Sequence, residues 1–386
     1  MLVDVGSGSV GLAISRQQKA QSQPEIIWSH REYILIKDTN AATHSLREIN
    51  TSIINAFLHL GSDGLKVLRS SYPQAQIEHC QLTISAPWAY TISRFISYKQ
   101  EQPFRVSKTL VNELTTAADQ KALTAVLERA IVGKNGLRVI ETKTIGIIAN
   151  GYPFEQYEHI HTKTAAIELA HLTGITYQEL MQTVTDSLTK ILPHVMIFPH
   201  VFMYVFYDVM RDLMPQTNES CLIDVTSEAT EMSILRDNLL RHTSHIAVGS
   251  YTLARRIATE TGLPNEEAYA FIRGGHELIM EKLSKTKQAK LDAVLTAYED
   301  ELVALFQQTG DTLAIPKTIY LHADTDTETF FKNCLRRAAK RATATEHMVY
   351  TITSVFFATD HATSTDTTIL LLANFAHKQL ESGAEE

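Results

Sequence analysis

The first 87 residues alternate between apolar and polar positions, which predicts strands. The alternation covers Leu2–Asp4, Val10–Arg16 and Glu25–Ile36, joined by Gly/Ser-rich and Gln-rich turns. Apolar residues then recur at helical spacing over His44–Ser70, although two glycines near the end of this range can break a helix. Ile77–Ser85 returns to strand. The expected order is three strands, a helix and a strand.

Residues 88–192 show a different order of predicted strands and helices. Helical spacing and alternation are mixed here, with Asn-Gly-Tyr-Pro turn chemistry at 150–153. The pattern predicts a small α+β domain inserted into a larger one. Its expected strands are Tyr90–Tyr98, Leu137–Asn150 and Ala165–Leu172, and its expected helices are Val106–Arg129 and Tyr177–Ile191.

Residues 193–386 return to alternating strands followed by helices. A short strand and a helix are expected first, over Val195–Phe198 and Val201–Leu213. Asp237-Asn238 suits a two-residue hairpin turn, and Gly274-Gly275 suits a helix end better than a phosphate loop. The other expected strands are Cys221–Val225, Glu231–Arg236, Leu239–Val248, Thr318–His322 and Val349–Ala358, and the other helices are Tyr251–Gly262, Asn265–Arg273, Leu278–Gln308, Glu328–Arg341 and Thr367–Leu380.

One segment of the chain is repeated. Residues 2–14 align without gaps with residues 222–234, and five aligned pairs are identical. Another strand and then a helix follow each segment. Short alignments arise by chance, but the matching order of elements indicates a duplicated unit. The identical pairs are Leu2/Leu222, Asp4/Asp224, Val5/Val225, Ser7/Ser227 and Ile14/Ile234.

The first repeated segment has the chemistry of a phosphate-binding hairpin. Gly6 and Gly8 let the backbone approach a ligand closely and take positive φ, so that consecutive N–H groups surround phosphate oxygens. Ser7 and Ser9 add hydroxyl donors. Asp4 would hold Mg²⁺ through water, since a carboxylate repels phosphate. A merely flexible hairpin is the alternative.

The second segment offers the same chemistry in a weaker form. Asp224 is placed like Asp4, and Thr226, Ser227 and Thr230 supply hydroxyl groups. Glu228 lies in the turn, where it would repel phosphate unless a cation or a turned-away side chain intervenes. Two such hairpins facing each other would hold a triphosphate between two halves of the molecule.

Composition and charge narrow the function. The net charge is −8 with no Lys/Arg block, which argues against nucleic acid. Three distant cysteines and scattered histidines favour neither disulfides nor a metal site. Met1 leads directly into a strand, so we expect no signal peptide, and no apolar stretch is long enough to span a bilayer. A cytoplasmic protein is expected.

The repeated motifs resemble those of the actin-like ATPases. Asp4–Val10 resembles their first phosphate motif and Ile223–Thr230 resembles their second. Within this superfamily the chain is similar to the cell-division protein FtsA and the type IV pilus assembly protein PilM. Further similar segments are Arg241–Gly249 and Gly262–Ala268, which follow the second motif, and Ile145–Tyr152 and Ala165–Gly174, which fall in the inserted domain.

The resemblance implies an α/β protein with a duplicated actin-like (ribonuclease H-like) fold and an inserted small α+β domain. We divide the chain into a first actin-like subdomain (1–87), an inserted interaction subdomain of the SHS2 type (88–192) and a second actin-like half (193–386). It also implies that Gly249 joins the hairpins in binding ATP with Mg²⁺. Activity would be at most that of a weak ATPase.

The resemblance further implies protein partners, either divisome or pilus inner-membrane components, and self-association. The last expected helix has one basic residue, Lys378, so we expect the membrane to be reached only through a partner, at its inner face. Aromatic residues near the start of the inserted domain either form a contact patch or fill its core. They are Trp88, Tyr90, Phe95, Tyr98 and Phe104.

Two departures from the family's pattern keep other functions open. The second motif usually has glycines where Thr226, Ser227 and Glu228 stand, and the adenosine motif usually has a glycine pair where this chain has His322-Ala323-Asp324. Side chains there would crowd a nucleotide. A nucleotide-free interaction platform is therefore the main alternative to an ATP-binding scaffold. A sugar or acetate kinase, or a chaperone ATPase, fits less well.

Overall fold

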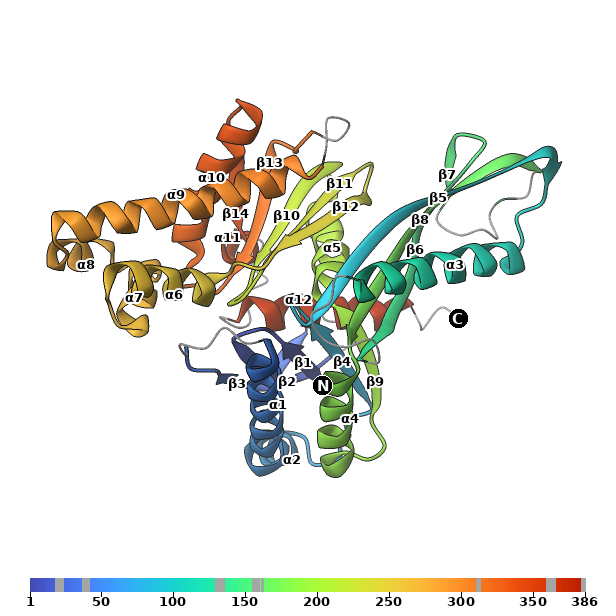
Figure 1. Ribbon diagram of the computed structural model, residues 1–386. Helices are drawn as coiled ribbons and strands as arrows, with labels where there is room; N and C mark the ends of the chain where they lie inside the picture. The colour runs from blue at the N-terminus through green and yellow to red at the C-terminus, as the bar shows by residue number, and fades with distance from the viewer. Residues whose placement is uncertain are drawn as a thin grey trace.

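The computed structural model describes residues 1–17, 24–36, 42–128, 136–154, 160, 163–309, 314–358 and 366–382. It shows two lobes, each built on a five-stranded sheet, and a four-stranded sheet that projects from between them (Figure 1). The mixed α/β architecture agrees with the fold class that the sequence predicts.

The first sheet has the strand order β3-β2-β1-β4-β9. β1, β2 and β3 pair antiparallel, while β4 and β9 are parallel to β1. Every residue of β1 is buried, because helices cover both faces of this sheet. The strands are β1 (Leu2–Val5), β2 (Ser9–Arg16), β3 (Glu25–Tyr33), β4 (His79–Ile84) and β9 (Met196–Val201).

Two groups of helices pack on the first sheet. α1 packs against β2, β3 and α4, and α12 packs against β1, β2, β4 and α5. The chain forms a π-helical turn over Leu60–Gly64, where the sequence contains the two helix-breaking glycines. The helices are α1 (Ala42–His59), α2 (Leu65–Ser71), α4 (Gln178–Ile191), α5 (Phe202–Leu213) and α12 (Thr367–Ser382).

The second sheet repeats the plan of the first. Its order is β12-β11-β10-β13-β14, again with three antiparallel strands followed by two parallel ones. The duplication inferred from the sequence is thus a duplication of the whole sheet. The strands are β10 (Glu219–Val225), β11 (Thr230–Arg236), β12 (Leu239–Ile246), β13 (Thr318–Ala323) and β14 (Met348–Thr351).

Alternate residues of β10 belong to different hydrophobic cores. Cys221, Ile223 and Val225 pack in the core of the second lobe, whereas Leu222 joins the core that includes α5 and α12. Leu222 and Asp224 therefore face the first lobe. The helices of the second lobe are α6 (Ser250–Thr261), α7 (Asn265–Ile272), α8 (His276–Lys282), α9 (Lys285–Gln307), α10 (Glu328–Thr343) and α11 (Ile352–Ala358).

The third sheet belongs to the segment predicted as an insertion. Its order is β5-β8-β6-β7, all antiparallel, and α3 packs against it. The aromatic residues near its start are packed; Trp88 is 5% exposed, and Tyr98 and Phe104 contact a core cluster. This favours a core role over a contact patch. The elements are β5 (Ala89–Phe104), β6 (Leu137–Ala149), β7 (Tyr152–Phe154), β8 (Thr164–Tyr177) and α3 (Lys108–Leu127).

One predicted strand is wrong. Val349–Ala358 was expected to be a strand, but β14 ends at Thr351 and α11 begins at Ile352. The Thr351 hydroxyl accepts a hydrogen bond from the backbone N–H of Ser354 (3.3 Å), which is the geometry of a helix N-cap. The β-branched residues in this range suit a strand as well as a buried helix, so the pattern alone could not distinguish them.

The sheets do not follow the expected boundaries closely. β9 completes the first sheet although it lies after residue 192, and α12 packs on that sheet from the far end of the chain. The three-domain division of the sequence stays a prediction. Among the described residues, no helix is long and apolar enough to cross a bilayer.

Candidate functional site

The two predicted hairpins meet between the lobes. Each turn is closed by the same bond, from the Gly6 N–H to the Ser9 carbonyl (3.0 Å) and from the Thr226 N–H to the Ala229 carbonyl (2.9 Å). The Glu228 N–H donates to the Ser7 hydroxyl of the other turn (2.9 Å). The structure therefore brings the two repeated segments together.

The turns touch through Gly8. A Cβ atom on Gly8 would lie 2.0 Å from the Ser227 Oγ, so any larger residue there would collide with the opposite turn. The expectation that Gly6 and Gly8 take positive φ is wrong, because the positive-φ glycines of the described chain are Gly151, Gly262 and Gly274. Gly8 is needed for close approach to protein, not for backbone conformation.

Arg31 joins Asp4 to the start of α12. Its Nη1 lies 2.9 Å from Asp4 Oδ2 and donates to the Ser9 hydroxyl (2.8 Å). Its Nε and Nη2 donate to both carboxylate oxygens of Asp366, at 2.7 and 3.0 Å. Asp366 also accepts from the Ile369 N–H (3.1 Å) and so caps α12. We call Arg31, Asp4, Ser9 and Asp366 the arginine clasp.

Gly11 makes room for the clasp. Asp4, Gly11 and Arg31 are neighbours across β1, β2 and β3. A Cβ on Gly11 would lie 2.6 Å from Arg31 Nη2, so the arginine side chain reaches Asp4 by crossing this glycine. The register of the sheet thus places a cation beside the carboxylate that was predicted to bind Mg²⁺.

Burial and the charge of Arg31 act against each other at the two carboxylates of the clasp. Burial raises the pKa of Asp4 to about 6, against the opposing charge of Arg31. At Asp366 burial acts in the same sense, but the charge and hydrogen bonds of Arg31 outweigh it and lower the pKa. The bidentate contact explains why the arginine favours Asp366 over Asp4.

Asp224, the other predicted magnesium ligand, has a histidine partner. His322 Nδ1 lies 2.7 Å from Asp224 Oδ1, and its Nε2 lies 3.1 Å from the Thr368 hydroxyl on α12. Burial opposes a charged His322, but the hydrogen bond and charge of Asp224 outweigh it and raise the histidine pKa. His322 lies in the segment where the resemblance led us to expect a glycine pair, and it pairs there with Asp224.

The N-terminus of α6 donates hydrogen bonds to the second turn. The N–H groups of Tyr251 and Thr252 donate to the Ser227 carbonyl, at 2.8 and 3.3 Å. A Cβ on Gly249 would lie 2.2 Å from the Thr226 carbonyl oxygen, so this glycine lets α6 pack on the turn. A helix N-terminus can bind phosphate, but these N–H groups already have protein acceptors.

The two threonine hydroxyls of the second hairpin donate to carbonyl groups of the protein. The Thr226 hydroxyl donates to the Ala86 carbonyl (3.0 Å) and the Thr230 hydroxyl to the Val248 carbonyl (2.7 Å). The Glu228 carboxylate accepts from Arg255 on α6 (2.9 Å). The repulsion that this glutamate would exert on phosphate is reduced by that pairing.

These contacts test whether the site fits ATP with Mg²⁺. Among the described residues, Asp4 Oδ1 and Asp224 Oδ2 are buried without a hydrogen-bond partner, so each aspartate keeps one acceptor that suits a water or a hydrated cation. The phosphate side does not fit, because Gly8 lies against Ser227 and the Ser7 and Ser9 hydroxyls are engaged by Glu228 and Arg31. A triphosphate would have to separate the turns and displace Arg31.

The sequence reasoning missed Arg31, Asp366 and the role of His322. Arg31 lies in a predicted strand, and only the pairing of Gly11 with Arg31 shows that it reaches Asp4. Asp366 is more than 300 residues away in sequence and carries the Asp-x-x-Ile spacing of a helix cap, which is a weak signal. The role of the ten predicted residues in nucleotide binding stays a prediction.

Comparison with known proteins shows the fold. No protein-family model matches the chain, and none of the curated proteins matches it in sequence. Among solved structures, the PilM–PilN type IV pilus biogenesis complex matches with a TM-score of 0.60 and 11% identity over 97% of this chain and 97% of that chain. At such identity the likeness shows an actin-like fold, which confirms the predicted class and the PilM-like resemblance in structure.

Two further solved structures match more distantly. The ethanolamine utilization protein EutJ from Carboxydothermus hydrogenoformans has a TM-score of 0.46 and 11% identity, over 97% of this chain and 88% of that chain. A protein with an actin-like ATPase fold from Bacteroides thetaiotaomicron has a TM-score of 0.43 and 8% identity, over 91% and 89%.

Proposed function

We propose that this chain is an actin-like scaffold that works by binding partner proteins, with its lobes joined by its own side chains instead of by ATP and Mg²⁺. Of the two scaffold hypotheses from the sequence, this is the nucleotide-free one. The arginine clasp is the observation that carries it, since Arg31 pairs with the carboxylate that would otherwise face a metal.

Energetics support this proposal over an ATP-binding scaffold. The Arg31 side chain is 15% exposed and that of Asp4 is 4% exposed, so the pair is largely shielded from water. Breaking a buried pair costs about 3–5 kcal/mol when one charge is left alone. ATP with Mg²⁺ would have to break the Arg31–Asp4 pair and separate the two turns, which weakens its net affinity.

Isothermal titration calorimetry with ATP and MgCl₂ tests this proposal. We expect no binding heat from the wild-type chain at millimolar nucleotide. Binding in the micromolar range that Asp4→Ala and Asp224→Ala both weaken would contradict it, and would restore the ATP-binding scaffold with Gly6–Ser9, Thr226, Ser227, Thr230 and Gly249 around the phosphates. Glu113→Gln, an exposed change on α3, is the control for nonspecific effects.

We further propose a pilus-assembly role ahead of a cell-division role. The matching solved complex contains PilM with PilN, and this supports a protein partner of that kind. The chain would act in the cytoplasm and reach the inner face of the membrane through its partner. Binding of a purified PilN-like protein, but not of a tubulin-like division protein, is expected in analytical ultracentrifugation. The reverse preference would favour division, and sedimentation of the chain alone tests self-association.

A further inference from the structure

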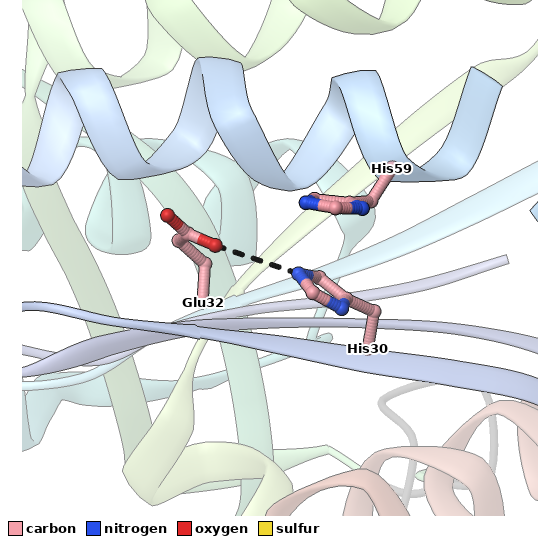
Figure 2. Close-up of side chains that lie close together, drawn as sticks. All are labelled: His30, Glu32 and His59. Atoms are coloured by element: carbon pink, nitrogen blue, oxygen red, sulfur yellow. Dashed lines mark ion pairs between the residues drawn. The ribbon is translucent and has the colours of Figure 1, made fainter. Parts of the chain in front are cut away.

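Two histidines and a glutamate meet where β3 passes beneath the end of α1 (Figure 2). One ligand atom from each of His30, Glu32 and His59 lies within 4.8 Å of the other two. We propose that these three residues bind a divalent transition metal of the zinc class. This site is on the first lobe and is separate from the arginine clasp.

The fold brings the three residues together for a simple reason. Side chains in a strand alternate between faces, so His30 and Glu32 project from one face of β3 and Arg31 from the other. α1 covers the first face, and His59 is its last residue. In Figure 2 the imidazole of His59 points down from the helix toward the strand that carries the other two residues.

The ligand atoms are available for a metal. Within the part of the chain that the structure describes, His30 Nε2 is buried without a hydrogen-bond partner, and it lies 3.5 Å from Glu32 Oε2. The rings of His30 and His59 stack with their centroids 4.1 Å apart. An imidazole nitrogen binds a metal in the plane of its ring, so the two stacked rings, inclined by 29°, must rotate to direct one nitrogen each at an ion beside Glu32.

Neighbouring side chains orient two of the ligands. The Asn55 amide donates to the other oxygen of Glu32, Oε1 (3.2 Å), and Asp63 Oδ2 lies 3.5 Å from His59 Nδ1. A carboxylate on the distal nitrogen of a histidine fixes the ring and raises its basicity in metal sites. This arrangement leaves Glu32 Oε2 and His59 Nε2 for coordination.

The donor set selects the metal class. Two nitrogens and one carboxylate oxygen suit Zn²⁺ and its transition-metal neighbours, whereas Mg²⁺ and Ca²⁺ prefer oxygen donors throughout. Ligands of one tetrahedral zinc ion lie roughly 3.3 Å apart, so modest side-chain rotations close the present spacing. The side chains are 27%, 26% and 47% exposed, for His30, Glu32 and His59 respectively, which leaves a path for the ion and for a water as fourth ligand.

The test is direct binding of Zn²⁺ and Co²⁺ to the full chain. We expect one Zn²⁺ per chain by calorimetry with a raised thermal midpoint, no such response to Mg²⁺, and visible Co²⁺ absorption bands of a four-coordinate site. His30→Ala and His59→Ala should each weaken affinity at least about tenfold, and Asp63→Asn about tenfold. His194→Ala, which removes an exposed histidine before β9, is the matched control.

Two results would overturn the proposal. One is zinc binding with unchanged stoichiometry and affinity in the His30→Ala/His59→Ala double variant. The other is absence of the Co²⁺ bands in the wild type. Circular dichroism on each variant separates lost binding from lost folding, and the Glu32→Gln variant keeps the shape of the site while it removes the charged ligand.

Discussion

Arg31 reaches two carboxylates and a hydroxyl across a glycine, and this explains why Gly11 differs from its counterpart Glu231 in the repeat. In the first lobe the row across the strands is Asp4, Gly11 and Arg31. In the second lobe Asp224 is flanked by Glu231 and by His322. The two halves thus neutralise equivalent aspartates by different means.

Replacing Arg31 tests the stability that the clasp provides. We expect Arg31→Met to lower the free energy of unfolding by about 3–5 kcal/mol, because Asp4 and Asp366 would stay buried without their cation. Urea denaturation measures the change. Arg337→Met is the control, since Arg337 pairs with Glu299 (2.6 Å) but is 54% exposed, and it should cost less than about 1 kcal/mol. Equal losses would contradict a special role for Arg31.

At the residue scale the sequence predicted that the two hairpins pair with each other, but not which side chains contact the aspartates of those hairpins. The identity of Asp4 with Asp224 and of Ser7 with Ser227 predicted the paired hairpins. Their partners are set by strand register and by a residue near the opposite end of the chain, and neither follows from local pattern. His322 was recognised as a departure, yet only the structure shows it bonded to Asp224.

Strand β11 carries a buried acid that makes stability depend on pH. Glu231 is 4% exposed, and burial is the main reason that its pKa is raised to about 8. Between about pH 4.5 and 8 the folded chain keeps a proton that the unfolded chain has lost. The free energy of unfolding therefore falls as pH rises through this window.

The same sign holds for two other buried groups, Asp4 and His322. The pKa of Asp4 is raised to about 6, so the protonated Asp4 side chain stabilises the folded chain at low pH. This stabilisation is lost as pH rises from the ordinary pKa of an aspartate toward 6. His322 contributes fully below its ordinary pKa, and that contribution is lost as pH rises through its raised value. Asp366 acts in the opposite sense because its pKa is lowered. Its contribution to the free energy of unfolding is lost only as pH falls below the ordinary pKa of an aspartate.

The Glu231→Gln variant should flatten the pH dependence. An amide of the same shape has no proton to lose, so its unfolding free energy should vary less between pH 5 and 8 than that of the wild type. Denaturation curves across this range measure the slope. Glu113→Gln, at an exposed position of α3, should leave the wild-type slope in place. Parallel curves for wild type and Glu231→Gln would show that Glu231 is ionised in the folded chain.

Element prediction succeeded where one period dominates. The three-strand starts of both halves follow directly from their patterns, whereas the range Leu278–Gln308, expected as one helix, is divided between α8 and α9 at Leu283 and Ser284. β5 continues through Lys99–Gln102, a polar run that reads as loop, because it pairs with β8 before and after an irregularity. β8 continues past Leu172 because Gly174 lets it approach Val201, whose Cγ1 would lie 2.7 Å from a Cβ at that position.

Across the whole molecule, the two lobes meet through contacts from both halves of the repeat. The Ser7 hydroxyl accepts from Glu228, and the Tyr251 hydroxyl donates to the Ile34 carbonyl (3.1 Å). α12 adds a third connection, because its capping residue Asp366 accepts from Arg31 and its Thr368 contacts His322. A substitution in the arginine clasp should therefore change the local stability of both lobes.

Hydrogen exchange can detect this coupling. Arg31→Met should speed exchange in the peptide that contains Glu228, although no contact between Arg31 and Glu228 is described, because the clasp holds the turn that Glu228 binds. Arg337→Met should leave that peptide unchanged. Faster exchange confined to β1, β2 and β3 would show that the lobes move independently. Adding ATP and MgCl₂ to the wild type should alter neither turn.

Strand β3 also limits which insertions and deletions the chain can tolerate. His30 and Glu32 face α1, while Arg31 between them faces Asp4 and Asp366. Loss or gain of one residue in the strand would exchange the two faces, since side chains alternate with period two. The guanidinium would then lie beneath a helix and the imidazoles beside two buried acids. A single frame-preserving indel would thus abolish both sites together, whereas point substitutions can remove either one alone.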